Sequence, residues 1–391
     1  MPRIATLITR LEGGAGLLTL RGALSLDREQ FQVTIIAGSG SLLDEAAAAG
    51  LEVIVEPALC RAIDPRRDRR ALGSLSDLLR ERSFDVAHTH TAKAGVLGRM
   101  AAHRAGLPWI VHTYHGFPFH EFQSRWRRSA YVAIERRLGR ITDVALCVGT
   151  GVAVEAIRRG LLPPERIRTI GVAAGTGPAS GSGAGARERA RRALGIPPGA
   201  TVVGSVGRLT YQKAPEDFVA TIRALSDQAA GPPEVTGVWI GGGELAGHVG
   251  RLAAQRLGPR IVLAGERADV PALLPAFDVF VLPSRYEGLP TAVVEAMACG
   301  VPVVATAVNA VSDVVVPGET GLLVPPRRPD LMAGAVRYLL DRPAAAARMA
   351  DNARARLGRR FDISTLRDAL VQAYTVRSQS ATICDDGVIS G

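Results

Sequence analysis

The chain has 391 residues, a length that suits two domains better than one. Hydrophobic residues make up 47% of it and charged residues 21%, which excludes a disordered protein. No apolar run reaches ~18 residues, so no membrane-spanning helix is expected, and the first residues predict a strand rather than a signal peptide. The net charge of +10 suggests an anionic partner: a phosphorylated substrate, an anionic membrane surface or nucleic acid.

Cysteine and lysine usage adds two constraints. The four cysteines lack the spacing of a metal site or a disulfide framework, so a reducing cytoplasm fits best. Only two of the 47 basic residues are lysines, Lys93 and Lys213. Because an ammonium is a compact point charge that a guanidinium does not replace everywhere, both lysines are candidate functional residues.

Short apolar runs alternate with helix-length segments in the first half of the chain. The runs that we expect to form buried parallel strands are residues 4–9, 32–37, 51–56, 85–88, 109–112 and 143–148. Helices are expected between them, including residues 94–105 and 126–138. Strands and helices in alternation predict a doubly wound α/β sheet.

The second half repeats this pattern after residues 173–186, a stretch rich in Gly, Ala and Ser that predicts a linker. The expected strands are residues 202–206, 235–240, 261–264, 279–282, 301–306 and 321–324. We therefore expect domains at 1–172 and 187–358, and a helix over 359–376 with a return to the first domain as one option. A polar tail follows at 377–391. Ligands of such domains bind at strand carboxyl ends, so the cleft between the two is the expected site.

The first domain carries a glycine turn and four histidines at predicted strand ends. Residues 12–16, Glu-Gly-Gly-Ala-Gly, follow the first strand and form either an anion-binding helix start or a simple tight turn. His88 and His90 close the fourth strand, and the segment from His112 to His115 closes the fifth. A structural role is the simpler interpretation for any one histidine, but four at two adjacent strand ends favour a site. The scarcity of acidic residues nearby argues against a metal.

The second domain carries a cationic turn and two spaced glutamates. Arg208 and Lys213 lie in the turn after its first strand, where both cations can point at one diphosphate. Glu287 precedes a helix that begins at Thr291, and Glu295 lies inside that helix. Carboxylates suit hydrogen bonds to vicinal sugar hydroxyls. The alternatives are solvated surface charges, although apolar neighbours make that a poor interpretation of Glu295.

Together these motifs resemble the retaining glycosyltransferases of family four. The matching segments are Gly-Arg-Leu-x-x-x-Lys at 207–213, the two glutamates with seven residues between them, and residues 85–95, 112–117, 296–306 and 317–325. The likeness covers about residues 3–374 and implies the GT-B fold, two doubly wound Rossmann-like domains that face each other across a cleft. It departs from the family at 170–177, where a Pro-Asn-Gly-Val-Asp type of loop is missing.

The resemblance implies a role for each matching residue. The catalytic set would be His115, Glu287, Arg208 and Lys213, with the two cations on the diphosphate. The nucleotide-sugar-binding set would be Gly14, Gly242, Arg267, Gly288, Leu289, Thr291, Ala292 and Glu295. The acceptor-side set would be His88, His90, Lys93, Phe117 and Phe119. No cofactor is implied and, without an Asp-x-Asp pair, no metal; a UDP-sugar is favoured over a GDP-sugar as co-substrate.

The acceptor side combines five aromatic residues and three arginines between residues 117 and 131. These suit a lipid-linked sugar or an apolar natural product as acceptor, and a peripheral contact with anionic membrane at its cytoplasmic face. Alternatively, the aromatics pack beneath the following helix. The expected setting is bacterial polysaccharide, glycolipid or natural-product biosynthesis. A sugar-nucleotide epimerase or phosphorylase of this fold and a basic non-enzymatic binding protein are the alternatives; no nucleic-acid motif is present.

Overall fold

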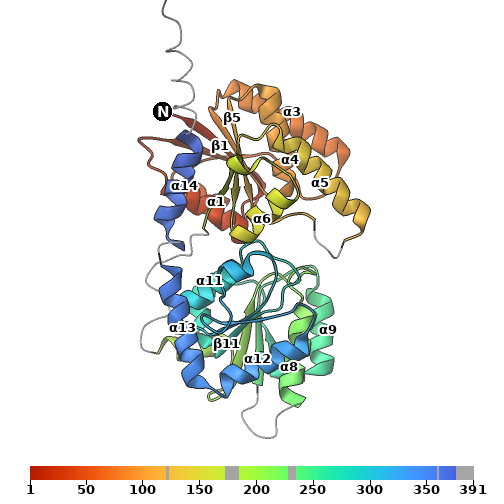
Figure 1. Ribbon diagram of the computed structural model, residues 1–391, viewed down its shortest axis with the longest axis vertical. Helices are drawn as coiled ribbons and strands as arrows, with labels where there is room; N and C mark the ends of the chain where they lie inside the picture. Colours follow the sequence, from red (N-terminus) through yellow and green to blue (C-terminus); the bar gives the residue numbers. More distant parts are fainter. Residues whose placement is uncertain (120–122, 172–184, 228–234, 359–360, 376–391) are drawn as a thin grey trace, which may run out of the picture. The chain divides into compact units, whose positions relative to one another are not determined.

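The computed structural model describes residues 1–119, 123–171, 185–227, 235–358 and 361–375. The chain forms two compact units, one of residues 1–173 together with 361–391, and one of residues 174–360 (Figure 1). The predicted linker falls almost entirely outside the described residues, and so does the predicted tail. No helix in the described ranges is both long and apolar enough to cross a membrane.

The first unit is built on a seven-stranded parallel sheet in the order β3-β2-β1-β4-β5-β6-β7. Its strands are β1 (Arg3–Arg10), β2 (Gln32–Ser39), β3 (Glu52–Val55), β4 (Val86–His90), β5 (Trp109–Tyr114), β6 (Val144–Cys147) and β7 (Ile167–Thr169). Its helices are α1 (Gly13–Ser25), α2 (Leu43–Ala48), α3 (Pro65–Glu81), α4 (Ala92–Ala105), α5 (Arg125–Gly139), α6 (Thr150–Arg158) and α14 (Ile363–Thr375), with the short η1 (Pro164–Arg166). β4 and β5 run two residues further than predicted, because their pairing continues through His90 and Thr113.

The second unit has a six-stranded parallel sheet in the order β10-β9-β8-β11-β12-β13. Its strands are β8 (Thr201–Val206), β9 (Val235–Ile240), β10 (Ile261–Leu263), β11 (Val279–Leu282), β12 (Val303–Thr306) and β13 (Leu322–Val324). Its helices are α7 (Ala186–Ala193), α8 (Pro215–Asp227), α9 (Ala246–Arg256), α10 (Val270–Leu273), α11 (Thr291–Ala298), α12 (Pro329–Leu340) and α13 (Pro343–Leu357), with η2 (Gly258–Arg260), η3 (Leu274–Ala276) and η4 (Asn309–Asp313). Two doubly wound parallel sheets confirm the predicted fold class.

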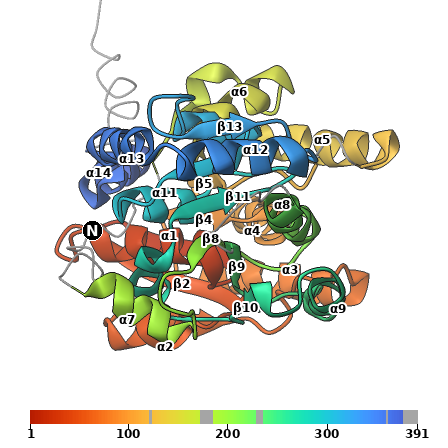
Figure 2. The same ribbon diagram turned by 90° about the horizontal axis from the view of Figure 1, so that it is seen from below.

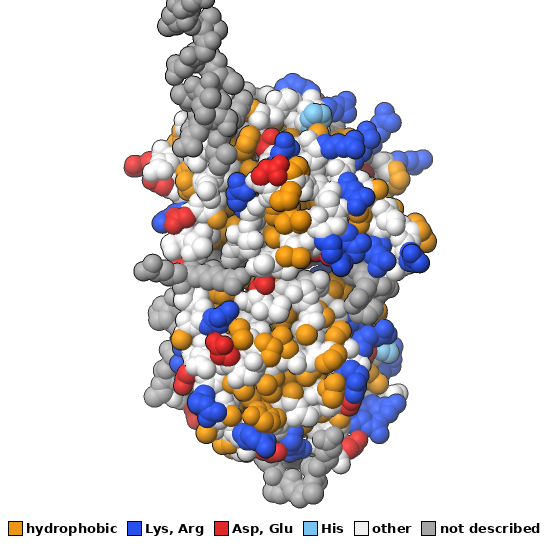
Figure 3. All heavy atoms as spheres, in the orientation of Figure 1, with side chains coloured by type: hydrophobic (Ala, Val, Ile, Leu, Met, Phe, Trp, Pro, Cys, Tyr) orange, Lys and Arg blue, Asp and Glu red, His pale blue; other side chains and the backbone are white. Residues whose placement is uncertain are grey.

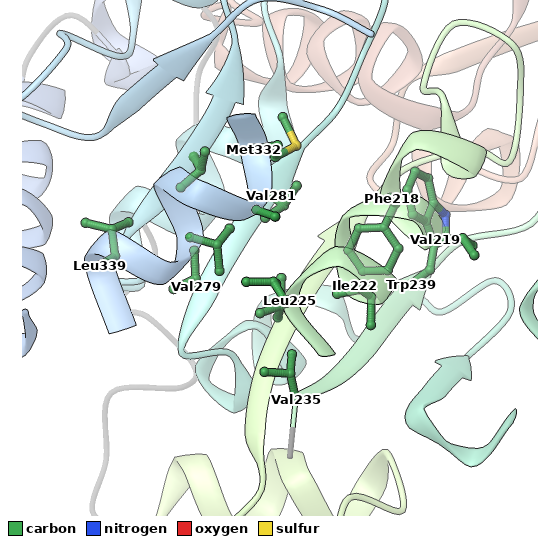
Figure 4. Close-up of a cluster of buried hydrophobic side chains, with 14 of the residues drawn as sticks. Phe218, Val219, Ile222, Leu225, Val235, Trp239, Val279, Val281, Met332 and Leu339 are labelled. Carbon is green, nitrogen blue, oxygen red and sulfur yellow. The ribbon is translucent and has the colours of Figure 1, made fainter. Parts of the chain in front are cut away.

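The core of the second unit also holds the start of the turn after β8, which carries Arg208 and Lys213. Figure 2 shows α8 and α12 side by side, and Figure 4 shows their apolar side chains meeting those of β9 and β11. Trp239 on β9 is 1% exposed, and its ring meets Phe218 of α8 edge to face at 5.4 Å. The indole Nε1 of Trp239 donates to the carbonyl oxygen of Gly207 at 2.8 Å. The core thus fixes the residue that precedes Arg208.

The last described helix, α14, belongs to the first unit, although the whole second unit precedes it in the sequence. It packs on α1, where Gly22 leaves room for Leu370: a Cβ at Gly22 would lie 3.0 Å from the leucine Cδ1. The indole Nε1 of Trp109 on β5 donates to the carbonyl oxygen of Ala373 at 2.9 Å. Tyr374, 6% exposed, completes this contact at the sheet.

Candidate active site

The parallel strands of the second unit bring several predicted donor residues to one edge of the sheet. The turns after β8 and β9 are joined because the Leu209 amide donates to the carbonyl oxygen of Gly242 at 2.6 Å. The turns after β9 and β10 are joined because the Gly241 amide donates to Gly265 at 2.7 Å. Carboxyl ends of parallel strands are where α/β sheets bind ligands.

Glycines make this close approach of the turns possible. Gly241 adopts φ +133°, and a Cβ there would lie 2.2 Å from the carbonyl oxygen of Gly207. Gly243 adopts φ +150°, and a Cβ there would lie 2.5 Å from the carbonyl oxygen of Leu209. Any side chain at these positions would push the turns apart, because L-residues avoid such φ values and the neighbouring atoms are backbone.

Two of the predicted catalytic residues form an ion pair. Lys213, in the turn after β8, places its Nζ 2.5 Å from Oε1 of Glu287, in the turn after β11. The same carboxylate oxygen accepts a hydrogen bond from Ser284 Oγ at 2.6 Å. The Glu287 side chain is 4% exposed and that of Lys213 is 18% exposed. The turns at this sheet edge therefore hold the Glu287 carboxylate buried and oriented, with the more exposed Lys213 ammonium beside it.

Further contacts lock these two turns together. The Arg285 amide donates to the carbonyl oxygen of Gln212 at 2.8 Å, and Gln212 Nε2 donates to the carbonyl oxygen of Tyr286 at 3.1 Å. The Arg285 guanidinium donates to the carbonyl oxygen of Tyr211 at 2.7 Å and lies 4.1 Å from the centre of its ring. Such preorganisation keeps the Lys213–Glu287 geometry without a bound ligand.

The other residues predicted to bind the nucleotide sugar differ in whether their side chains already have a partner. Arg208 is exposed, and its side chain makes no hydrogen bond or ion pair with any described residue. Arg267 instead forms a two-pronged pair with Asp269, at 2.7 and 2.6 Å. Glu295 is partly buried on α11. The Arg208 guanidinium is thus available to bind an added anion, whereas the Arg267 guanidinium is already paired with Asp269.

The remaining residues predicted to bind the nucleotide sugar lie at the start of α11. Leu289 and Ala292 are each 9% exposed, Gly288 is buried, and Thr291 is partly buried. The Pro290 carbonyl accepts from the Val293 and Val294 amides. The amides of Thr291 and Ala292 donate to no described residue, as is usual in a first helical turn.

Histidines gather at the ends of β4 and β5 in the first unit, as predicted. His88 uses both ring nitrogens: Nδ1 lies 2.6 Å from the Tyr374 hydroxyl and Nε2 lies 2.7 Å from Thr113 Oγ1. His112 Nδ1 lies 2.8 Å from Thr89 Oγ1. Burial lowers the pKa of His88 to about 3 and that of His112 well below its usual range, so both are neutral at pH 7.

His90 and His115 form a second histidine pair, which lies beside His88. His90 Nδ1 lies 3.0 Å from Nε2 of His115, and the rings of His88 and His90 are 4.1 Å apart. His90 is 5% exposed, and its Nε2 meets no partner among the described residues. Burial lowers the pKa of His115 to about 4. His115 is thus a neutral imidazole, anchored through His88 and His90 to the core.

The predicted acceptor-side residues divide into three groups. Phe117 and Phe119 stack on each other at 4.6 Å, and Phe119 is 5% exposed. Trp126, by contrast, is 69% exposed, so only part of the aromatic cluster packs inside. Lys93 pairs with Asp68 at 2.6 Å. Gly14, a predicted donor contact, lies exposed in the first turn of α1.

Sequence reasoning gave no role to several residues that shape the site. Tyr374 lies 286 residues from its partner His88. Asn309 Oδ1 accepts a hydrogen bond from the Glu287 amide at 3.0 Å, 22 residues away. Its position just beyond a strand end was the available signal. No group of three or more His, Cys, Asp or Glu side chains in the described ranges is arranged to hold a metal ion.

Comparisons with known proteins match both units. Residues 13–173 match the family model described as "Glycosyl transferase 4-like domain", and residues 200–342 match "Glycosyl transferases group 1". An Escherichia coli relative, UDP-Gal:alpha-D-GlcNAc-diphosphoundecaprenol alpha-1,3-galactosyltransferase, is 32% identical over 73% of each chain. A Rhodococcus opacus D-inositol 3-phosphate glycosyltransferase is 27% identical over 93% of this chain and 85% of its own.

Solved structures show the same fold. Anabaena HepE in complex with UDP and glucose superposes with a TM-score of 0.81 at 22% identity, covering 97% of this chain and all of its own. WaaG, a glycosyltransferase involved in lipopolysaccharide biosynthesis, gives a TM-score of 0.76 at 17% identity, covering 95% and 100% of the two chains.

Proposed function

Because this chain belongs to the GT4-type glycosyltransferases of the GT-B fold, we propose that it is a retaining, metal-independent hexosyltransferase. The reaction breaks the bond between the sugar's anomeric carbon and the diphosphate. It forms a bond from that carbon to an acceptor hydroxyl, which loses its proton, and releases a nucleoside diphosphate. Polysaccharide, glycolipid or natural-product biosynthesis in a bacterial cytoplasm is the setting that we propose.

The observation that carries this proposal is the ion pair between Lys213 and Glu287. One N–H of the Lys213 ammonium donates to the Glu287 carboxylate, with 2.5 Å between Nζ and Oε1. The other two N–H groups remain available to a diphosphate oxygen. Arg208, without a partner among the described residues, adds a second cation for the charge that develops on the leaving group. Glu287 would accept hydrogen bonds from the donor sugar's hydroxyls, and Glu295 from the ribose.

Groups around these residues would complete donor binding. The amides at the start of α11, with Gly242 and Arg267, suit the phosphates and the base. From the first unit, Gly14 would approach the phosphate and His115 the sugar near its reacting carbon. A neutral imidazole can exchange hydrogen bonds with a sugar hydroxyl without adding a charge.

A UDP-sugar is the donor that we propose, in preference to a GDP-sugar. The Escherichia coli relative is named for a UDP-galactose donor, and the HepE structure holds UDP and glucose. Lys213 and Arg208 would provide the charge that a divalent ion supplies in other transferases. No cofactor is proposed.

For the acceptor we propose a lipid-linked sugar, with a soluble natural product as the alternative. The acceptor-side residues would be His88, His90, Lys93, Phe117 and Phe119. The Escherichia coli relative is named for a diphosphoundecaprenol-linked substrate.

We also propose that α5 brings the protein to the cytoplasmic face of an anionic membrane. Its exposed side chains include Trp126 at 69% and Ile134 at 44%. Its single acid, Glu135, is buried, and its five arginines leave a basic surface. Figure 3 shows Lys and Arg side chains gathered along the side of the first unit where α5 lies. Exposed aromatic and basic groups on one helix suit an anionic bilayer interface.

Release of nucleoside diphosphate from a panel of UDP- and GDP-sugars, with a polyprenyl-diphosphate-linked sugar as acceptor, tests the reaction. We expect Arg208→Ala or Lys213→Ala to lower turnover at least ~100-fold, the scale of one lost transition-state donor. Arg223→Ala, which removes a 45% exposed arginine of α8, is the matched control. Turnover should survive a strong chelator.

Two results would contradict the proposal. Near-wild-type turnover in both cation variants would remove the diphosphate assignment. An altered nucleotide sugar without released nucleoside diphosphate would favour an epimerase of the same fold.

A further inference from the structure

The Glu287 turn is held by the last residue of β12 and by the segment that follows this strand. Thr306 Oγ1 donates to the carbonyl oxygen of Ser284 at 2.6 Å, and both residues are buried. Three residues further on, Asn309 Oδ1 accepts a hydrogen bond from the Glu287 amide at 3.0 Å. The turn is thus fixed at both its ends by one short stretch of chain.

These backbone contacts determine where the Glu287 carboxylate points. Its Oε1 receives bonds from Ser284 and from Lys213, at 2.6 and 2.5 Å. Ser284 is held in turn by Thr306, and the Glu287 backbone is held by Asn309. Lys213 is the group that a diphosphate would share, so the Thr306 and Asn309 contacts must preserve the geometry during binding.

Asn309 has two properties that only a few residues combine. Its backbone adopts φ +43°, a left-handed conformation that asparagine tolerates better than other residues with a Cβ. Its side chain is also short enough to return an oxygen to a nearby amide. The residue is exposed, so replacing it removes nothing from the core.

We propose that Asn309 is a positioning residue for Glu287: it orients the carboxylate toward the donor sugar through the Glu287 backbone. This inference rests on the proposed function, in which Glu287 contacts the sugar. In this role Asn309 acts through its bond to the Glu287 amide and not through contact with the substrate. Losing its bond should therefore impair sugar transfer while leaving the hold on the nucleotide intact.

Two substitutions separate the side-chain bond from the backbone conformation. Asn309→Gly keeps the left-handed conformation accessible and removes the acceptor, whereas Asn309→Asp keeps both. We expect kcat to fall about tenfold in Asn309→Gly, the scale of one hydrogen bond, with calorimetric affinity for free UDP unchanged. Asn309→Asp should stay within about threefold of wild type on the same scale. Hydrogen exchange at the Glu287 amide should accelerate in the glycine variant alone.

A double variant tests whether Asn309 acts through Glu287. In a Glu287→Gln background, Asn309→Gly should cost no further activity, because the group it positions is already lost. An equal cost in both backgrounds, or unchanged kcat in Asn309→Gly, would overturn the proposal. If the wild-type protein turns over no nucleotide sugar, the proposed function fails. The amide exchange then decides the positioning role by itself, and unchanged exchange in the glycine variant would reject it.

Discussion

His88 is a buried imidazole that must stay neutral in the folded protein. It is 1% exposed, and burial lowers its pKa from 6.5 to about 3. In the unfolded chain it binds a proton below pH 6.5, so its presence destabilises the fold progressively as the pH falls below that value. This loss in the free energy of unfolding is negligible at pH 7.5 and amounts to about 2 kcal/mol at pH 5.

We therefore expect His88→Asn to be less harmful in acid. The variant loses the bonds to Tyr374 and Thr113 at any pH, but it also removes the proton-linked penalty. Its deficit in the free energy of unfolding should shrink by about 2 kcal/mol between pH 7.5 and pH 5. Urea denaturation at the two pH values measures this difference. A deficit independent of pH would contradict the neutral, buried assignment.

The sequence indicates which single residues lie at the sheet edge where a residue type and a strand end coincide. Glu287 and Lys213 stand beside apolar runs that mark β11 and β8, and the structure joins them in an ion pair. Asn309 and Tyr374 could not be found in this way. Their roles depend on hydrogen bonds to residues 22 and 286 positions away, which no local pattern encodes.

At the scale of elements, a buried ion pair ties α4 to α5. Arg99 is fully buried, and its Nη2 donates to Oε2 of Glu135 at 2.8 Å. The Tyr114 hydroxyl donates to the same oxygen at 2.9 Å, and Arg99 Nε donates to the carbonyl oxygen of Gly95 at 2.7 Å. Because every partner is desolvated, removing one charge strands the other.

We expect Glu135→Gln to lower the free energy of unfolding by about 3 kcal/mol, the low end for breaking a buried pair. Asp330→Asn is the control, since its partner Arg328 is 51% exposed, and its loss of stability should be clearly smaller because solvent screens the pair. Chemical denaturation of both variants gives the comparison. Equal losses would show that α4 and α5 do not depend on this pair.

Element boundaries were predictable to the extent that strands are apolar runs. Residues 279–282 form β11 as predicted, since all four are buried. β12 begins at Val303 rather than at residue 301, because Pro302 has no amide to donate to a neighbouring strand. β7 was missed: it has three residues, and Arg168 and Thr169 are exposed, so no apolar run marks it.

At the scale of the whole molecule, membrane contact makes a prediction about sedimentation with vesicles. Phosphatidylglycerol vesicles should carry the protein down at low salt, and phosphatidylcholine vesicles should not. About 1 M salt should release it, since screening shortens the Debye length to about 3 Å. Trp126→Ala should weaken the binding, whereas Tyr338→Ala on α12, which removes a 39% exposed aromatic, should not. No binding to anionic vesicles at low salt would shift the acceptor to a soluble molecule.

The position of α14 sets the order in which the molecule can be completed. During synthesis the seven strands of the first unit leave the ribosome early, but the helix that covers α1 and supplies Tyr374 emerges only after the entire second unit. Until then, Trp109 lacks the Ala373 carbonyl, His88 lacks the Tyr374 hydroxyl, and apolar surface on α1 stays open to water. The nascent chain therefore carries an unfinished amino-terminal unit from the completion of β7 until α14 emerges. A fragment that stops before residue 361 inherits the same gap permanently.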